Sequence, residues 1–101
     1  MLKEISSLRN LIEKSKKEIV LIYKHSLTCN CARASRKELE KYKGDIFEMA
    51  VQTNRPLSNE IAKKLNISHE SPQIIAIKNG KPIFVLDHQE INNENIKKLL
   101  K

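Results

Sequence analysis

The chain has 101 residues, a formal net charge of +7, and 40% hydrophobic and 31% charged residues, which is typical of one globular domain with a modest core. No run of about 18 apolar residues occurs, so we expect no membrane-spanning helix, and the charges spread through residues 1–14 argue against a signal peptide. The lysines are dispersed and the aromatic residues are few, so we expect a solvated basic surface and no nucleic-acid partner.

The first part of the chain predicts two helices with a buried strand between them. An amphipathic helix is predicted over residues 2–17, because apolar residues recur there at helical spacing (Leu2, Ile5, Leu8, Leu11 and Ile12). The uninterrupted apolar run 19–23 predicts a strand that is buried on both faces. Residues 30–43 return to a helical pattern, and Gly44 is placed to end that helix.

The rest of the chain predicts three strands and two helices. They are a strand over 46–51, a helix capped by Asn54 with Pro56 in its first turn, strands over 73–77 and 82–86 joined by an Asn79-Gly80 turn, and a last helix from Asn92 or Asn93. Strands separated by helices of this length pair in parallel through right-handed crossovers, and the hairpin adds an antiparallel strand. We therefore predict one α/β domain over residues 1–101, with a four-stranded mixed sheet, helices on both faces and the order α-β-α-β-α-β-β-α.

Cys29 lies where the loop after the first strand gives way to the helix over 30–43. Free N–H groups of a first helical turn and the positive end of the helix dipole stabilise a thiolate, and such a position lowers the pKa of a cysteine from about 8.5. Lys24 and Arg33 are near in sequence and can add positive charge. We predict that Cys29 is a nucleophilic redox cysteine. Two cysteines in a chain without a signal peptide favour a reducing compartment.

Cys31 follows Cys29 by two positions, and Ala32 occupies the position three residues on that would share its helical face. Residues two apart point to nearly opposite sides of a helix, so a disulfide between the two cysteines would require some unwinding of the first turn. Three roles stay open for Cys31: a resolving thiol, a bystander beneath the site, and a metal ligand.

A Ser-Pro pair, Ser71-Pro72, precedes the strand over 73–77. Cis X-Pro bonds are a minority state and usually serve a structural purpose. A cis bond there would turn the backbone of Ser71 towards an extended thiol substrate. The alternative is a trans proline that opens the strand.

The three histidines differ in position. His25 precedes Cys29 on the same loop and can lower its pKa when protonated or relay a proton, although simple solvation fits it as well. His69 can reach a substrate groove or have no role, and His88 is predicted to be a surface residue after the last strand.

Two segments resemble the YtxJ-like monothiol bacilliredoxins of the thioredoxin superfamily. They are Lys24-His25-Ser26-Leu27-Thr28-Cys29, and His69-Glu70-Ser71-Pro72-Gln73 followed by an apolar strand and Lys78-Asn79-Gly80. The resemblance covers the whole chain and implies a thioredoxin-like fold, here without an N-terminal strand. It also implies a cytoplasmic oxidoreductase that removes bacillithiol from protein mixed disulfides, with bacillithiol as thiol co-substrate and no cofactor or metal.

The resemblance carries the family's nucleophile over to Cys29 and its cis-proline to Pro72. Ser71, His25 and Thr28 then lie where the substrate binds, and Cys31 joins Cys29 as a candidate catalytic residue. The expected partners are bacillithiolated proteins and bacillithiol, with neither nucleic acid nor membrane.

The chain departs from this family where Asn30-Cys31-Ala32 replaces the usual Pro-Ile-Ser after the nucleophile. It departs from ordinary thioredoxins where Thr28 and Tyr23 stand in place of a tryptophan and an acidic proton acceptor, which disfavours a general disulfide reductase. Two other classes stay open. One is a metal-binding or chaperone module that uses both cysteines and a histidine, although a closed zinc site would need further ligands. The other is a redox-inactive adaptor that keeps only the fold.

Overall fold

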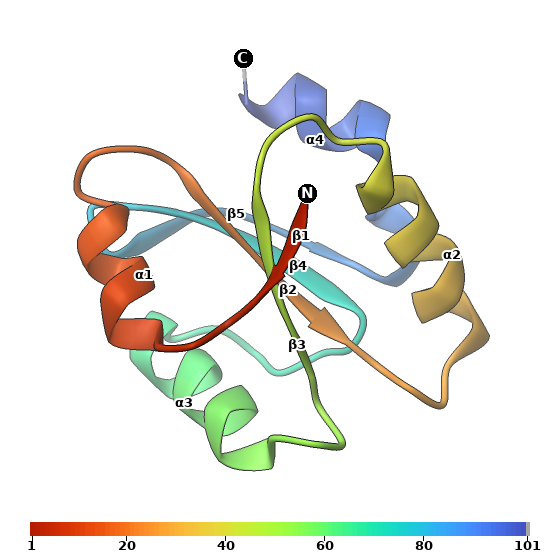
Figure 1. The fold of residues 1–101 in the computed structure, drawn as a ribbon, viewed down its shortest axis with the longest axis horizontal. Coiled ribbons are helices and arrows are strands. Elements are labelled where there is room, and N and C mark those ends of the chain that lie inside the picture. The colour runs from red at the N-terminus through yellow and green to blue at the C-terminus, as the bar shows by residue number, and fades with distance from the viewer. Residues whose placement is uncertain (101) are drawn as a thin grey trace.

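A five-stranded mixed sheet forms the centre of the computed structural model, which describes residues 1–100 (Figure 1). Its strands are β1 (Leu2–Glu4), β2 (Val20–His25), β3 (Ile46–Ala50), β4 (Gln73–Lys78) and β5 (Lys81–Asp87). Their order across the sheet is β1-β3-β2-β4-β5, so β1 and β5 are the edges. β3 pairs in parallel with β1 and β2, whereas β4 is antiparallel to both β2 and β5.

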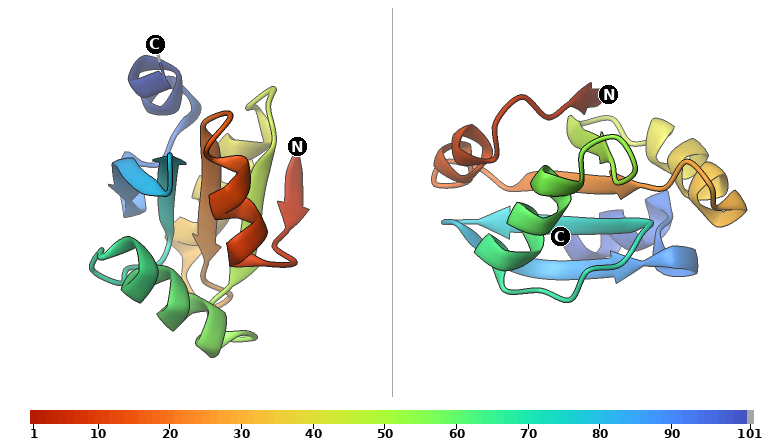
Figure 2. Two further views of the ribbon diagram at one scale, coloured as in Figure 1. Left: turned by 90° about the vertical axis from the view of Figure 1, so that its left-hand side faces the viewer. Right: turned by 90° about the horizontal axis from the view of Figure 1, so that it is seen from below.

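Helices cover both faces of this sheet, as the views in Figure 2 show. The helices are α1 (Leu8–Lys14), α2 (Asn30–Glu40), α3 (Arg55–Leu65) and α4 (Asn93–Leu100), with a short 3₁₀ helix, η1 (His88–Glu90), after β5. Apolar residues of α1 and α3 share one core cluster with Val20 and Ile22 of β2. Residues of α2 and α4 share the other with Leu21 and Tyr23, because successive strand residues point to opposite faces. The predicted α/β architecture with helices on both faces is confirmed.

The N-terminal segment differs from the prediction of one helix over residues 2–17. Leu2–Glu4 forms β1, which pairs in parallel with β3. Helix α1 begins only after Ser7, whose side chain accepts a hydrogen bond from the Asn10 N–H group at 3.3 Å and caps the helix. The sheet therefore has five strands instead of four, and the prediction of a missing N-terminal strand was wrong. A strand of three residues is too short to show the alternation that would have identified it.

Local signals place most of the other boundaries. The Asn54 side chain caps α3 by accepting from the Leu57 N–H group at 3.2 Å. Asn79 and Gly80 both have positive φ, 54° and 73°, as a tight hairpin turn requires, and the ladder between β4 and β5 has an irregularity at Ala76/Ile77. In residues 1–100, none of the helices is long and apolar enough to cross a membrane.

Candidate active site

The two cysteines lie at the start of α2, where the loop from β2 enters the helix. Cys29 is the N-cap residue, with an extended backbone (φ −107°, ψ 125°), and Cys31 is in the first turn. Both are half-buried, their sulfurs form a disulfide, and their Cα atoms are 5.4 Å apart, within the usual range for a disulfide. The expectation that they point apart was wrong, because Cys29 precedes the helix and does not have helical geometry.

The N-terminus of α2 favours a thiolate at Cys29. The helix is 11 residues long, and its first turn carries no acidic side chain. The positive end of the helix dipole therefore faces the reduced sulfur without a competing carboxylate in that turn. The Ala32 N–H group donates to the Cys29 carbonyl at 3.1 Å, whereas the N–H groups of Asn30 and Cys31 precede the first turn's intrahelical acceptors, and a thiolate at the cap can accept hydrogen bonds from such groups.

His88 joins Cys31 to the loop before β4. Its Nδ1 atom is 3.9 Å from Cys31 Sγ, and its Nε2 atom is 3.0 Å from Glu70 Oε1. The sequence placed His88 on the surface, and its side chain is indeed 45% exposed, but it also contacts one of the two cysteines. The signal that could have found it is the hairpin, since its register pairs Gln73 with Asp87 and so brings residue 88 beside Pro72.

The Ser71–Pro72 peptide bond is cis, and Pro72 is buried whereas Ser71 is half-exposed. The Pro72 carbonyl accepts a hydrogen bond from the His88 N–H group at 3.0 Å. The buried Gln73 side chain donates from Nε2 to the carbonyl of Ser68 and to Asp87 Oδ1, both at 3.0 Å. These bonds hold the loop beside the end of β5, so Ser71 and Pro72 lie next to His88, which in turn contacts Cys31.

Lys24 has a different partner from the one that its sequence position indicates. It is fully buried, and its Nζ atom lies 3.0 Å from His69 Nδ1, on the sheet face opposite Tyr23 and His25. Ser58 Oγ of α3 is 3.3 Å from the same ring nitrogen. Burial lowers the pKa of Lys24 to about 8, and burial and the Lys24 charge lower the pKa of His69. The Lys24 amine therefore contacts His69, which belongs to the loop between α3 and β4.

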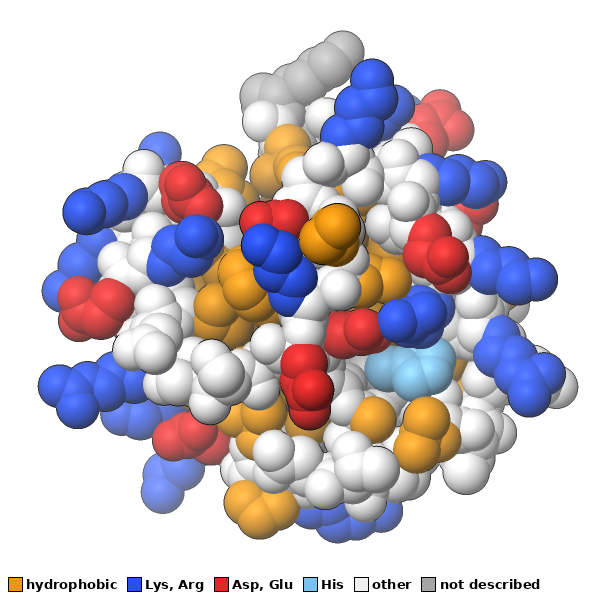
Figure 3. All heavy atoms as spheres, viewed as in Figure 1, with side chains coloured by type: hydrophobic (Ala, Val, Ile, Leu, Met, Phe, Trp, Pro, Cys, Tyr) orange, Lys and Arg blue, Asp and Glu red, His pale blue; other side chains and the backbone are white. Residues whose placement is uncertain are grey.

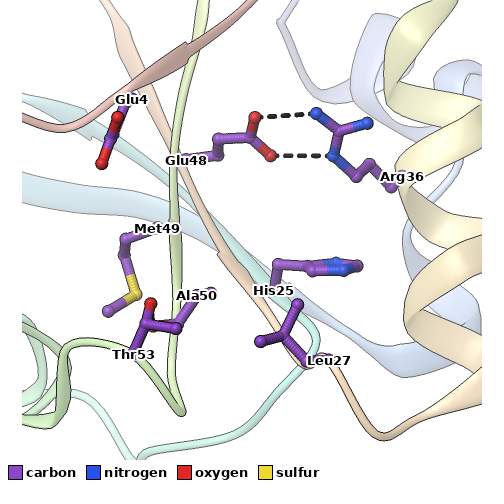
Figure 4. A pocket seen from close by; sticks show the side chains of 8 residues that line it. All are labelled: Glu4, His25, Leu27, Arg36, Glu48, Met49, Ala50 and Thr53. Atoms are coloured by element: carbon purple, nitrogen blue, oxygen red, sulfur yellow. Dashed lines mark hydrogen bonds and ion pairs between the residues drawn. The ribbon is translucent and has the colours of Figure 1, made fainter.

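His25 lies on the α2 face, at the edge of a cavity of about 460 Å³ (Figure 4). Its Nδ1 atom is 3.0 Å from Tyr23 Oη, which itself donates to the Ala32 carbonyl at 3.1 Å. Because the tyrosine hydrogen is used on a carbonyl, which can only accept, His25 donates from Nδ1 and keeps Nε2 as an acceptor. Burial, with a smaller effect of the Arg36 charge, lowers the pKa of His25. A neutral ring fits the proton-relay interpretation better than the charge interpretation.

Charged and apolar side chains share the wall of this cavity. Arg36 of α2 makes two parallel hydrogen bonds to the Glu48 carboxylate of β3, at 3.0 and 2.9 Å (Figure 4). The other lining residues are Glu4, Leu27, Met49, Ala50 and Thr53. The two-bond geometry fixes α2 against the sheet beside His25. Elsewhere on the face in Figure 3, basic side chains are interspersed with acidic ones and do not form one patch.

Gln52 braces the loop that carries Thr28, a contact that sequence reasoning missed. Its Nε2 donates to Ser26 Oγ at 3.1 Å and to Thr28 Oγ1 at 3.3 Å, and its Oε1 accepts from the Leu27 N–H group at 3.0 Å. The loop therefore holds its shape while the Leu27 side chain remains 58% exposed. Leu27 is thus an exposed apolar side chain two residues before Cys29.

Within residues 1–100, no group of three or more histidine, cysteine, aspartate or glutamate side chains is arranged to hold a metal ion. The chemistry that the site supports on its own atoms is thiol–disulfide exchange at Cys29 and Cys31.

Comparison with known proteins agrees with this geometry. The family described as monothiol bacilliredoxin BrxC matches residues 1–96. The chain belongs to the monothiol bacilliredoxin family. As a bacilliredoxin it is a thiol–disulfide oxidoreductase, and its partners are thiols and disulfides.

Solved structures similar to this bacilliredoxin share the thioredoxin fold. A protein assigned as an oxidoreductase with a thioredoxin fold is 30% identical, with a TM-score of 0.87 over 99% of this chain and 94% of that one. Oxidised thioredoxin from Plasmodium falciparum is 19% identical, with a TM-score of 0.69 over 99% and 95%. Thioredoxin from Schistosoma mansoni is 24% identical, with a TM-score of 0.66 over 98% and 94%. The two thioredoxins show the fold alone, and the predicted thioredoxin-like fold is confirmed.

The family is described as monothiol, yet this bacilliredoxin carries a second cysteine whose sulfur reaches the first. The role of Cys31 is therefore a question that the family assignment does not answer.

Proposed function

We propose that the protein removes bacillithiol from mixed disulfides on other proteins, with Cys29 as the nucleophile. Bacillithiol is then the thiol co-substrate, and the reaction needs no bound cofactor. One observation carries the proposal: Cys29 is the half-buried N-cap of α2 in a chain of the bacilliredoxin family. We infer that it acts in the cytoplasm, the reducing compartment in which such a thiol is kept reduced between turnovers.

The first step is an exchange at the bacillithiol sulfur. The Cys29 thiolate attacks this sulfur, the bond between bacillithiol and the client protein breaks, and the client thiolate leaves and takes a proton from solvent. Cys29 then holds bacillithiol as a mixed disulfide, and no net oxidation has occurred. The rate of such a step depends on the thiolate fraction of the attacking cysteine, on its nucleophilicity and on access. The N-terminus of α2 raises the thiolate fraction of Cys29.

The surroundings of Cys29 suit a client segment in extended form. Ser71 is half-exposed next to buried Pro72, and Pro72 bonds to His88, which contacts Cys31, so the Ser71 backbone can pair with such a segment. Thr28 and the exposed Leu27 directly precede the cysteine, on the loop that Gln52 holds. His25, with Nε2 free to accept, is the candidate for relaying the proton of the Cys29 thiol.

The test is a client with one bacillithiolated cysteine, mixed with the reduced protein and followed by intact mass spectrometry. We expect the wild type to remove bacillithiol from the client and Cys29→Ser to leave it in place. The same client carrying glutathione is the control for substrate class. Removal of both adducts at the same rate would contradict a bacillithiol-specific activity, and turnover by Cys29→Ser would contradict the assignment of the nucleophile.

A further inference from the structure

Cys31, His88 and Glu70, which come from three separate elements, form a chain of contacts. Cys31 belongs to the first turn of α2, His88 begins η1, and Glu70 belongs to the loop before β4. The distances are 3.9 Å from Cys31 Sγ to His88 Nδ1 and 3.0 Å from His88 Nε2 to Glu70 Oε1. This is the order nucleophile, base and orienting carboxylate that activates a weakly acidic nucleophile.

We propose that Cys31 is the resolving thiol of this protein, that His88 takes its proton, and that Glu70 positions the His88 ring. The proposal deepens the proposed function, because it names the group that releases bacillithiol from Cys29. The family description, monothiol, does not assign this step.

The tautomer follows from the hydrogen-bond partners. An ionised Glu70 carboxylate can only accept, so the contact with Nε2 requires a proton on that nitrogen. In the neutral ring Nδ1 is then unprotonated and faces Cys31 Sγ, where it can accept the thiol proton. Glu70 therefore sets the ring in the state that a general base needs, and stabilises the imidazolium once it forms.

The backbone of His88 holds this ring in place from both sides. Its N–H group donates to the Pro72 carbonyl at 3.0 Å, and its own carbonyl accepts from Ser35 Oγ of α2 at 3.4 Å. Its φ is 51°, a left-handed conformation that glycine adopts at lower cost than a residue with a side chain. An imidazole thus stands at a position where the backbone alone would favour glycine.

The resolving step is a thiol–disulfide exchange in which Cys31 displaces bacillithiol from Cys29. The Cys31 thiol gives its proton to His88 Nδ1, and the thiolate attacks Cys29 Sγ. The bond between Cys29 and bacillithiol breaks as the Cys29–Cys31 bond forms, and bacillithiol leaves as a thiolate that takes the proton from His88. The two cysteines are oxidised and bacillithiol is reduced to its thiol. The product is the disulfide that the structure contains, and two external thiol groups, from two thiol molecules or one dithiol, must reduce it before another turnover.

The pH dependence of this step involves few groups. Cys31 and Glu70 are the titratable groups that contact the His88 ring among residues 1–100. The two acidic neighbours on the same segment bind elsewhere: the Asp87 carboxylate accepts from Gln73 Nε2, and Glu90 accepts from the Asp87 N–H group.

The experiment mixes the reduced protein with bacillithiol disulfide, quenches it with acid at short times and measures intact mass. Loading of Cys29 appears as added bacillithiol, and resolution as loss of that mass with formation of the internal disulfide. The variants are Cys31→Ser, His88→Asn, which tolerates the left-handed backbone, and Glu70→Gln, with exposed Glu94→Gln on α4 as matched control. The rate of loading shows whether a variant is folded and whether its Cys29 reacts, and it is measured separately from the rate of resolution.

We expect every variant to add bacillithiol to Cys29, Glu94→Gln at the wild-type rate, and Cys31→Ser to remain loaded. His88→Asn should resolve about 100-fold more slowly at neutral pH, the lower end for a positioned base, and should recover as rising pH ionises the thiol without help. Glu70→Gln should show a smaller loss in the same direction, and Glu94→Gln none.

Equal resolution rates and pH profiles for the wild type and His88→Asn would overturn the role of His88. Wild-type protein that stays loaded until bacillithiol is added would overturn the role of Cys31. Absence of loading on Cys29 would overturn the proposed function itself, and this inference with it.

Discussion

Lys24 opposes folding at neutral pH, and we expect Lys24→Met to stabilise the protein. The side chain is fully buried, and burial moves its pKa from 10.5 to about 8. Since one pKa unit corresponds to about 1.4 kcal/mol, keeping this amine charged inside the fold costs about 3 kcal/mol. Methionine has a similar volume and no charge, but it loses the contact with His69, which is worth about 1 kcal/mol. The net gain should be about 2 kcal/mol at pH 7.

The sign of the pH dependence follows from the same pKa. The folded-state value, about 8, is below the unfolded-state value of 10.5, so the unfolded chain binds more protons between them. The stability of the wild type should therefore rise as the pH increases through this window. The advantage of Lys24→Met should be complete below pH 8 and should disappear above pH 10.5.

The assay is urea unfolding of the reduced protein at pH 7 and at pH 10, with exposed Lys43→Met as the control for removing one positive charge. A gain of 2 kcal/mol moves the urea midpoint by on the order of 1 M. A loss of stability in Lys24→Met at pH 7, or a gain that persists unchanged at pH 10, would refute the reasoning. In that case the contact with His69, and not desolvation, would dominate the energetics of Lys24.

Three further outcomes are expected. Limiting iodoacetamide at neutral pH should label Cys29 ahead of Cys31 in peptide maps of the reduced protein, because the helix end favours the Cys29 thiolate; the reverse order would contradict that assignment. Tyr23→Phe should lower the unfolding free energy by about 1–3 kcal/mol in thermal melts, since the Ala32 carbonyl loses its buried hydroxyl partner; an unchanged melting temperature would mean that water replaces it. Gln52→Ala should slow loading of bacillithiol onto Cys29 several-fold while changing the unfolding free energy by no more than about 1–2 kcal/mol, because it frees the loop that precedes the cysteine; equal loading rates would show that the loop needs no brace.

Features set by neighbouring residues could be predicted from the sequence. Asn54 caps α3, Asn79-Gly80 turns the hairpin, and the apolar run before residue 24 is a central strand, because each depends on local conformation or on burial alone. Cys29 also lies at the start of α2 as predicted.

Features that depend on contacts between distant segments could not be predicted in this way. β1 exists because Leu2 pairs with Ile46 across the fold, and nothing within residues 2–4 indicates that partner. Lys24 precedes the cysteine loop in the sequence, yet strand alternation turns its side chain to the opposite face of the sheet from Tyr23 and His25. There its amine contacts His69. His88 reaches Cys31 only through the hairpin register and the backbone bond to Pro72.

The exposed edge β5 has a consequence for self-association. Its outer residue Ile83 is 48% exposed, which would invite a strand of a second molecule to add to the sheet and start an aggregate. Lys81 and Pro82 begin this strand. The ladder between β4 and β5 is irregular next to the pair formed by Pro82 and Ile77. A charge, a missing N–H donor and a bulge each discourage such addition. Addition of a second molecule's strand at this edge of the sheet is thus disfavoured.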